Sequence, residues 1–245
     1  MAGRVRRRWR LGWGYRLAVL LLWPLMTIFT KREWTGTENL NTDEGGIIVA
    51  GNHISWFDPF TIAHALWNND RPPRFLAKES VFRIPVVGRV ITSAGQIRVY
   101  RETSEAVAAV RDAIDAVQRG ECVVVYPEGT LTRDPEMWPM VGKTGAARIA
   151  LATRRPLIPV AQWGAQEVIG PYRREFRILP RKTIRVAVGR PVDFTDLYGR
   201  PFDSDTLREA TARIITAITD LLVGIRDGDP PAEPMVFRLP RKEGT

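Results

Sequence analysis

A continuous apolar run in the first third of the chain is the feature that most restricts its fold. Gly46-Ile47-Ile48-Val49-Ala50 has no polar position on either side of its pleat, which is typical of a strand buried on both faces of a sheet. A short polar turn and a helical segment over residues 59–67 follow it. A strand buried on both faces needs helices on both sides, so this pattern favours a layered α/β fold.

The same alternation of strand and helix signals continues along the chain. Further strands are predicted at residues 74–77, 96–100, 122–126, 157–163 and 184–188. Helices are predicted from Thr103 or Ser104 to Gly120, over 145–153, and after a cap at Asp203 or Ser204. Pro159 lies inside one strand and indicates an edge or irregular strand. We therefore predict an α/β fold with a mainly parallel, mixed sheet flanked by helices.

The N-terminal residues combine arginines with an apolar stretch. Five arginines crowd residues 1–10, and the apolar residues 17–29 follow, with Pro24 expected to kink a helix there. Thirteen helical residues reach only ~20 Å, short of a ~30 Å hydrocarbon core. We predict that residues 1–35 are an amphipathic, membrane-anchoring segment lying in the interface, with the arginines on anionic lipid. A spanning helix and a helix packed on the soluble core stay open as alternatives.

Two further divisions of the chain are predicted. Residues 36–226 form the main domain, because no internal repeat and no Gly/Ser linker interrupts them. Residues 227–245 contain four prolines and scattered charge, which predicts an extended, partly disordered tail.

The charge balance and the cysteine content narrow the function classes. Lys+Arg 36 against Asp+Glu 27 gives a formal charge of +9, which favours anionic partners such as lipid headgroups or phosphorylated substrates. Nucleic acid is not expected as a partner, because no DNA- or RNA-binding signature is present. Cys122 is the single cysteine and lies in a predicted strand, so an internal disulfide is impossible and a core role is expected.

The segment Asn52-His53-Ile54-Ser55-Trp56-Phe57-Asp58 carries the main chemical signal. Asp58 precedes Pro59 and is therefore expected to cap the following helix, while His53 lies on the turn after the buried strand. A turn folds these two side chains together, and an aspartate that orients an imidazole makes a general base. A serine nucleophile is not indicated, since no Gly-x-Ser-x-Gly occurs. No metal site is expected, because the chain has two histidines and one cysteine.

Four segments together resemble the conserved motifs of the glycerolipid acyltransferases that acylate lysophosphatidic acid. The segment 52–58 is similar to their first motif, Asn-His-x-Ser-x-x-Asp, and Tyr126-Pro127-Glu128-Gly129-Thr130 is similar to their third. Residues 95–101 and 156–161 resemble the second and fourth. Order and spacing agree over roughly residues 45–165. Two departures stand out: Tyr126 replaces the usual Phe, and Leu131 and Thr132 separate Thr130 from Arg133.

The resemblance implies an O-acyltransferase with the fold of that family. It would move an acyl chain from acyl-CoA or acyl carrier protein, as co-substrate, to the free hydroxyl of lysophosphatidic acid, forming phosphatidic acid without a cofactor. His53 would be the base and Asp58 its partner. The acceptor site would contain the phosphate ligand Arg101, the turn at Glu128, Gly129 and Thr130, and the cations Lys78, Arg133 and Lys143.

Several alternatives remain at this point. Glycerol-3-phosphate, another lysophospholipid or a glycolipid would also suit the site as acceptor. A non-catalytic basic protein that binds membrane or nucleic acid is the alternative from another class, motivated by the +9 charge. A lipid substrate and the N-terminal segment predict a peripheral or monotopic protein on the cytoplasmic face of the cell membrane.

Overall fold

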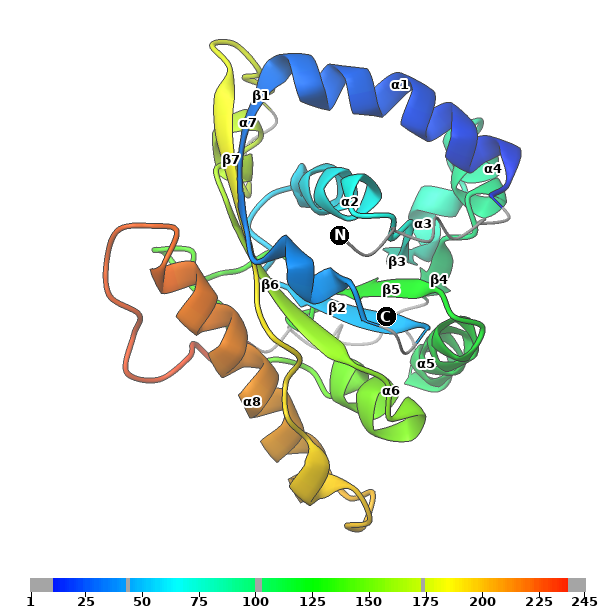
Figure 1. Cartoon of the computed structure of the whole chain (residues 1–245), viewed down its shortest axis with the longest axis vertical. Coiled ribbons are helices and arrows are strands. Elements are labelled where there is room, and N and C mark those ends of the chain that lie inside the picture. Colours follow the sequence, from blue (N-terminus) through cyan, green and yellow to red (C-terminus); the bar gives the residue numbers. More distant parts are fainter. Residues whose placement is uncertain (1–10, 43–44, 100–102, 173–174, 238–245) are drawn as a thin grey trace, which may run out of the picture.

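The computed structural model describes residues 11–42, 45–99, 103–172 and 175–237. Within these ranges the chain forms a seven-stranded sheet with helices on both faces (Figure 1). The strands are β1 Thr30–Thr35, β2 Ile47–Gly51, β3 Pro73–Lys78, β4 Ile97–Val99, β5 Cys122–Val125, β6 Leu157–Trp163 and β7 Lys182–Val188. The helices are α1 Trp13–Phe29, η1 Thr37–Leu40, α2 Asp58–Asn68, α3 Glu79–Phe82, α4 Val87–Ser93, α5 Thr103–Gln118, α6 Gly145–Thr153, α7 Ala165–Val168, η2 Thr195–Leu197 and α8 Ser204–Val223.

The sheet has the order β1-β7-β6-β2-β5-β3-β4. Strands β2 to β6 run parallel to one another, whereas β7 is antiparallel to β6, and β1 is parallel to β7. The predicted mainly parallel, mixed sheet is therefore confirmed. The apolar run Ile47–Ala50 lies in β2, and every residue of β2 is buried. Because the carboxyl ends of β2, β3 and β5 share one edge, the turns after them lie on the same side of the molecule.

Two apolar layers cover the sheet. On one face, the small and branched residues of α5, α6 and α8 pack on alternate residues of β2 and β5, such as Ile48 and Val123. On the other face, α2, α7 and the end of α1 cover the intervening residues, such as Val49 and Val124. The single cysteine, Cys122, is buried in this second layer, as expected for a core thiol.

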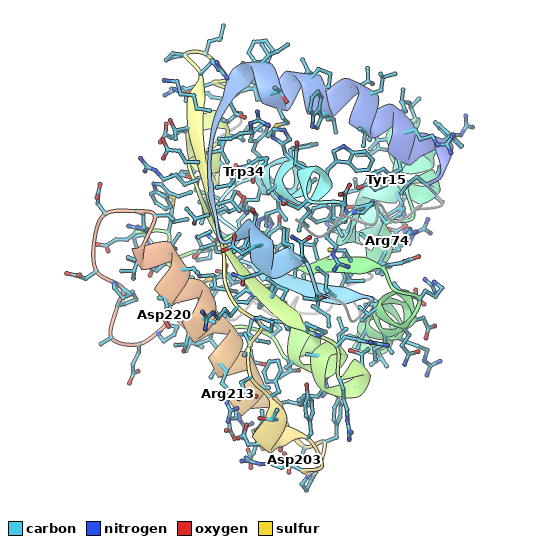
Figure 2. The ribbon with its side chains drawn as sticks, viewed as in Figure 1. Tyr15, Trp34, Arg74, Asp203, Arg213 and Asp220 are labelled. Carbon is cyan, nitrogen blue, oxygen red and sulfur yellow. The ribbon has the colours of Figure 1, made fainter. Side chains whose placement is uncertain are left out.

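Helix α1 crosses over α2 and reaches α4, as Figure 1 shows. Tyr15 packs against Trp67 of α2, with ring centroids 5.5 Å apart and the rings tilted by 35°, and Figure 2 shows Tyr15 and Trp34 on the side of the sheet that α1 and α2 cover. At the start of α1, a side chain on Gly14 would lie 2.3 Å from the carbonyl oxygen of Val90, so only glycine allows α4 to approach this closely.

The structure of the N-terminal segment differs from the prediction for residues 1–35. The helix occupies Trp13–Phe29 and continues through Pro24, and the next residues, Thr30–Thr35, form β1 in the main sheet. No residue separates the helix from the strand. Among the helices of the described ranges, none has the length and hydropathy needed to cross a membrane.

The prediction of an edge or irregular strand at Pro159 was wrong. Strand β6 lies inside the sheet, between β2 and β7. The Pro159 carbonyl accepts a hydrogen bond from Gly189 N at 2.9 Å, so the proline nitrogen faces β7 as well, at the end of the β6–β7 ladder. The missing N–H therefore leaves the pairing with β2 intact.

The C-terminal helix and tail follow the prediction in part. Asp203 caps α8 by accepting hydrogen bonds from Asp205 N and Thr206 N, as the sequence indicated. Beyond α8, residues 227–237 contain no helix or strand. They do not extend away from the molecule, because Val141 N donates a hydrogen bond of 3.0 Å to Met235 O.

Candidate active site

His53 and Asp58 meet on the turn between β2 and α2. The Nδ1 atom of His53 lies 2.8 Å from Oδ2 of Asp58, and Asp58 is fully buried while 14% of the His53 side chain remains exposed. The predicted pair is thus in hydrogen-bond contact. Since Nδ1 is hydrogen-bonded to the carboxylate, Nε2 is the nitrogen available to accept a proton.

Asp58 does not cap α2, so that prediction was wrong. The cap position is Phe57, and Asp58 is the first helical residue. The carboxylate turns back instead, and Oδ2 accepts hydrogen bonds from Ile54 N at 2.6 Å and Ser55 N at 2.8 Å. Burial raises the pKa of the Asp58 carboxyl, and the hydrogen bonds from His53 and the two amides oppose that rise.

Glu128 holds the second turn of the site against the first. One oxygen of its carboxylate accepts a hydrogen bond from His53 N at 3.0 Å, and the other accepts one from Met140 N at 3.1 Å. Burial raises the pKa of Glu128 to about 8, while these backbone hydrogen bonds lower it. The hydrogen bond from His53 N to the buried Glu128 carboxyl group fixes the main chain of His53.

Aromatic stacking completes the contact between the two turns. The Tyr126 ring lies 4.1 Å from the His53 ring, with an angle of 14° between the planes. The backbone N–H of Thr132 also donates to His53 O at 2.7 Å. The imidazole is consequently oriented from one side by a carboxylate and from another by a flat ring.

A buried polar network supports the turn from behind. Asn52 exchanges hydrogen bonds with the backbone of Gln162 on β6, at 3.0 and 2.9 Å. Thr61 of α2 donates to the side chain of Gln162, and Ser55 Oγ donates to Ile169 O at 2.6 Å. Ser55 thus shapes the turn, since its Oγ also accepts a hydrogen bond from Phe57 N. Gln162 and Thr61 lie outside the recognised motifs, so no local signal in the sequence pointed to them.

The predicted acceptor-binding residues fall into different surroundings. Gly129 adopts a left-handed φ of +67°, and a side chain there would lie 3.0 Å from Nζ of Lys143, so the Lys143 ammonium lies against this turn. Lys143 N also donates to Pro127 O at 2.8 Å. Thr130 is half-buried on the same turn.

Lys78 is exposed at the carboxyl end of β3, on the edge of the sheet that carries the site. Arg101 lies outside the described residues.

Arg133 lies beside a cavity next to the His53 turn. The cavity has a volume of about 530 Å³, and its lining includes Thr132, Arg133, Gln166, Tyr172 and Arg177. The Arg133 guanidinium lies 4.3 Å from the ring centroid of Tyr172 and 5.2 Å from that of Phe237. Sequence reasoning missed Tyr172 and Phe237, because neither lies in a motif and they come from segments far apart in the chain.

Arg98, in the segment that resembles the second motif, lies elsewhere. Its guanidinium is 4.6 Å from the Phe82 ring centroid, in a separate cavity of about 290 Å³ that Arg74 and Glu121 also line. Among the described residues, no group of three or more His, Cys, Asp and Glu side chains is arranged to hold a metal ion.

Several curated proteins similar to this chain are named 1-acyl-sn-glycerol-3-phosphate acyltransferase. The chain is 29% identical over 174 residues to a chloroplastic 1-acyl-sn-glycerol-3-phosphate acyltransferase of Brassica napus, covering 70% of the chain and 48% of that protein. It is 34% identical over 127 residues to a 1-acyl-sn-glycerol-3-phosphate acyltransferase of Borreliella burgdorferi, covering 51% of the chain and 48% of that protein. The chain thus spans about half the length of these relatives.

A solved structure shares the fold of this chain, and a family profile matches part of its sequence. The crystal structure of the 1-acyl-sn-glycerophosphate (LPA) acyltransferase PlsC from Thermotoga maritima aligns with a TM-score of 0.64 at 24% identity, covering 88% of this chain and 81% of that one, which shows a shared fold. The profile of the acyltransferase family matches residues 31–163, the range that contains His53, Asp58 and Glu128. The chain therefore belongs to the acyltransferase family.

Proposed function

We propose that this protein transfers an acyl chain from a thioester donor, acyl-CoA or acyl carrier protein, to the free hydroxyl of lysophosphatidic acid. The observation that carries the proposal is the 2.8 Å contact between His53 Nδ1 and Asp58 Oδ2 on a turn of the matched domain. The names of the relatives from Brassica napus and Borreliella burgdorferi support this choice of acceptor.

The geometry suits direct transfer with His53 as general base. Nε2 removes the hydroxyl proton while the hydroxyl oxygen attacks the thioester carbonyl, and Asp58 stabilises the imidazolium that forms. The C–S bond then breaks, the thiolate leaves and takes up the proton, and the new ester is phosphatidic acid. Such a base contributes ~10²–10⁴-fold to a rate. Backbone amides of the turn after Pro127 are candidates for the developing oxyanion.

The acceptor phosphate needs cations near this turn. Lys143 lies against the Glu128–Gly129 turn, and Arg133 lines the adjacent cavity, so both suit a phosphomonoester. Lys78 lies at the same sheet edge, and Arg101 follows the end of β4 in the sequence. Glu128, Gly129 and Thr130 shape the site rather than provide charge for the phosphate.

Helix α1 supplies a surface for contact with the lipid. Its outward side chains are large, apolar and exposed, among them Trp13, Leu20, Leu25 and Ile28, with Leu20 70% exposed. A helix with this pattern lies in the interface plane of a bilayer. We infer that the protein is a peripheral or monotopic enzyme on the cytoplasmic face of the cell membrane.

Thiol release from palmitoyl-CoA tests the proposed function. With lysophosphatidic acid present, His53→Ala should lower the rate ~10²-fold or more, because the base is lost. His64→Gln is the matched control: His64 lies inside α2 and should leave the rate nearly unchanged. Thiol release without any acceptor would instead indicate a thioester hydrolase. Faster release with glycerol-3-phosphate than with lysophosphatidic acid would identify glycerol-3-phosphate as the preferred acceptor.

A further inference from the structure

The Arg133 guanidinium contacts two aromatic rings from distant segments of the chain. Tyr172, on the loop after α7, lies 4.3 Å from it, and Phe237, near the end of the described chain, lies 5.2 Å from it. Both distances are within the ~6 Å range of cation–π attraction. Among the described residues, no carboxylate lies within ion-pair distance of Arg133. Rings rather than acids therefore hold this cation.

The loop that carries Arg133 is bonded to the main chain of His53. The Tyr172 hydroxyl donates to Thr132 O at 2.6 Å, and Thr132 N donates to His53 O at 2.7 Å. A displacement of Tyr172 would therefore move Thr132, the residue that precedes Arg133. The loop position and the guanidinium position depend on the same tyrosine.

The C-terminal segment 227–237 is fastened at both ends. At its start, the Arg226 guanidinium lies 4.1 Å from the Trp138 ring centroid and 4.3 Å from that of Trp163. Near its end, Met235 O accepts a hydrogen bond from Val141 N. Phe237 is thus brought to Arg133 by contacts that do not involve Arg133.

We propose that Tyr172 and Phe237 are positioning residues for Arg133, so that the C-terminal segment 227–237 forms part of the acceptor site. Contact with the rings engages the faces of a guanidinium and leaves N–H groups at its planar edge to bind a phosphomonoester. Arg133 and Tyr172 also line the cavity of about 530 Å³ beside the His53 turn, where an acceptor headgroup would enter. This inference rests on the proposed function.

Steady-state kinetics with varied lysophosphatidic acid and varied palmitoyl-CoA test the inference in the full-length protein. Phe237→Leu keeps apolar bulk but removes the ring, and it should raise the acceptor KM about two- to five-fold with the donor KM unchanged. Tyr172→Leu also removes the hydroxyl that donates to Thr132 O, so it is compared with Tyr172→Phe, which lacks the same hydroxyl but keeps the ring and should have the lower acceptor KM of the two. Arg133→Ala should raise the acceptor KM by about ten-fold or more. Phe237→Tyr should behave like the wild type, and so should Val223→Ala, because Val223 is exposed on α8, outside the segment.

A double-mutant cycle decides between positioning and general stabilisation. If Phe237 acts through Arg133, Phe237→Leu has no further effect on the acceptor KM in the Arg133→Ala background. An equal effect in both backgrounds, or a parallel fall in kcat and rise of the donor KM, overturns the inference. Failure of the proposed function gives a different result: the wild type forms no phosphatidic acid, or His53→Ala remains fully active.

Discussion

At the scale of single residues, one oxygen of Asp58 serves both the shape of the turn and the orientation of the proposed base. Oδ2 accepts hydrogen bonds from the amides of Ile54 and Ser55, and it also contacts the His53 imidazole. The same atom therefore fixes the turn and the orientation of the proposed base. An amide side chain separates these two tasks, because its oxygen can accept the backbone hydrogen bonds but carries no charge.

We expect Asp58→Asn to fold and to lose most of its activity. The imidazolium formed in the reaction would lack its counter-charge, so kcat should fall ~10³-fold. Asp58→Ala should also be destabilised, because two buried amides lose their acceptor at about 1–3 kcal/mol each. Thermal unfolding and thiol release check both variants. An Asp58→Asn enzyme with kcat close to wild type would rule out the charge as a catalytic factor.

The sequence predicted the partners in this site better than their local geometry. The spacing of His53 and Asp58 indicated a pair, and the pair exists. The role of Asp58 as a helix cap was inferred from Pro59, but helix caps and inward-facing turn residues share the same sequence signal. The carboxylate binds those amides that the turn brings close to it. The local sequence does not encode how the turn folds back.

At the scale of elements, the contact between α1 and α2 encloses the second histidine. His64 is 4% exposed, and its Nε2 lies 3.4 Å from Oγ1 of Thr27. The Trp34 ring of β1 approaches it edge-on, with centroids 5.1 Å apart. Burial, with a smaller effect of Arg32, lowers the pKa of His64 to about 4. The imidazole is therefore neutral in the folded protein at pH 7.

This buried histidine predicts a pH dependence of stability. Between pH 6.5 and about 4 the unfolded chain binds a proton at His64 that the folded protein does not, so the free energy of unfolding decreases as the pH falls through this window. The total decrease is about 3 kcal/mol. Urea unfolding at several pH values measures it. His64→Gln should remove this part of the slope, and an unchanged slope in that variant would assign the effect to other groups.

Element positions were predictable where packing is local, and less so where it is not. The spacing of apolar residues located α5 and α8, because their apolar faces follow directly from it. The placement of β1 and of the proline-containing β6 depends on pairing with β7, which lies far away in the sequence. Strand pairing of this kind leaves no signal within a single strand.

At the scale of the whole molecule, an exposed apolar helix and a positive net charge suit the proposed contact with lipid. The outer side of α1 exposes large apolar residues, and the chain carries a formal charge of +9. Apolar burial and attraction to anionic headgroups strengthen each other at a bilayer surface. The apolar and the electrostatic contributions to membrane binding can be measured separately.

Co-sedimentation with anionic liposomes checks this arrangement. Replacing Leu20, Leu25 and Ile28 by Asn should reduce bound protein strongly, since these side chains face outward and their loss leaves the contacts with α2 intact. Val107→Asn with Val223→Asn, exposed on α5 and α8, is the control and should bind like wild type. Raising the salt from about 0.1 M to about 1 M should weaken binding of the wild type. Binding by the α1 variant equal to wild type would place the lipid contact elsewhere.

The return of the C-terminal segment is the long-range feature that the sequence did not indicate. Its prolines predicted an extended tail, and residues 227–237 do lack helix and strand. Their contacts with Val141 and Arg133 depend on where α8 ends and on the loop after Glu128. Composition predicts the conformation of such a segment, but not the surface on which it lies.

The direct junction of α1 and β1 at Phe29 and Thr30 also has a mechanical consequence. With no linker between α1, the proposed lipid-contacting helix, and the sheet edge, the domain would have no joint about which to tilt or swing on a membrane. Its height above a bilayer would then be a fixed dimension, set by the packing of α1 on α2 and α4. An acceptor would have to rise from its leaflet by a constant amount to bring its hydroxyl to His53.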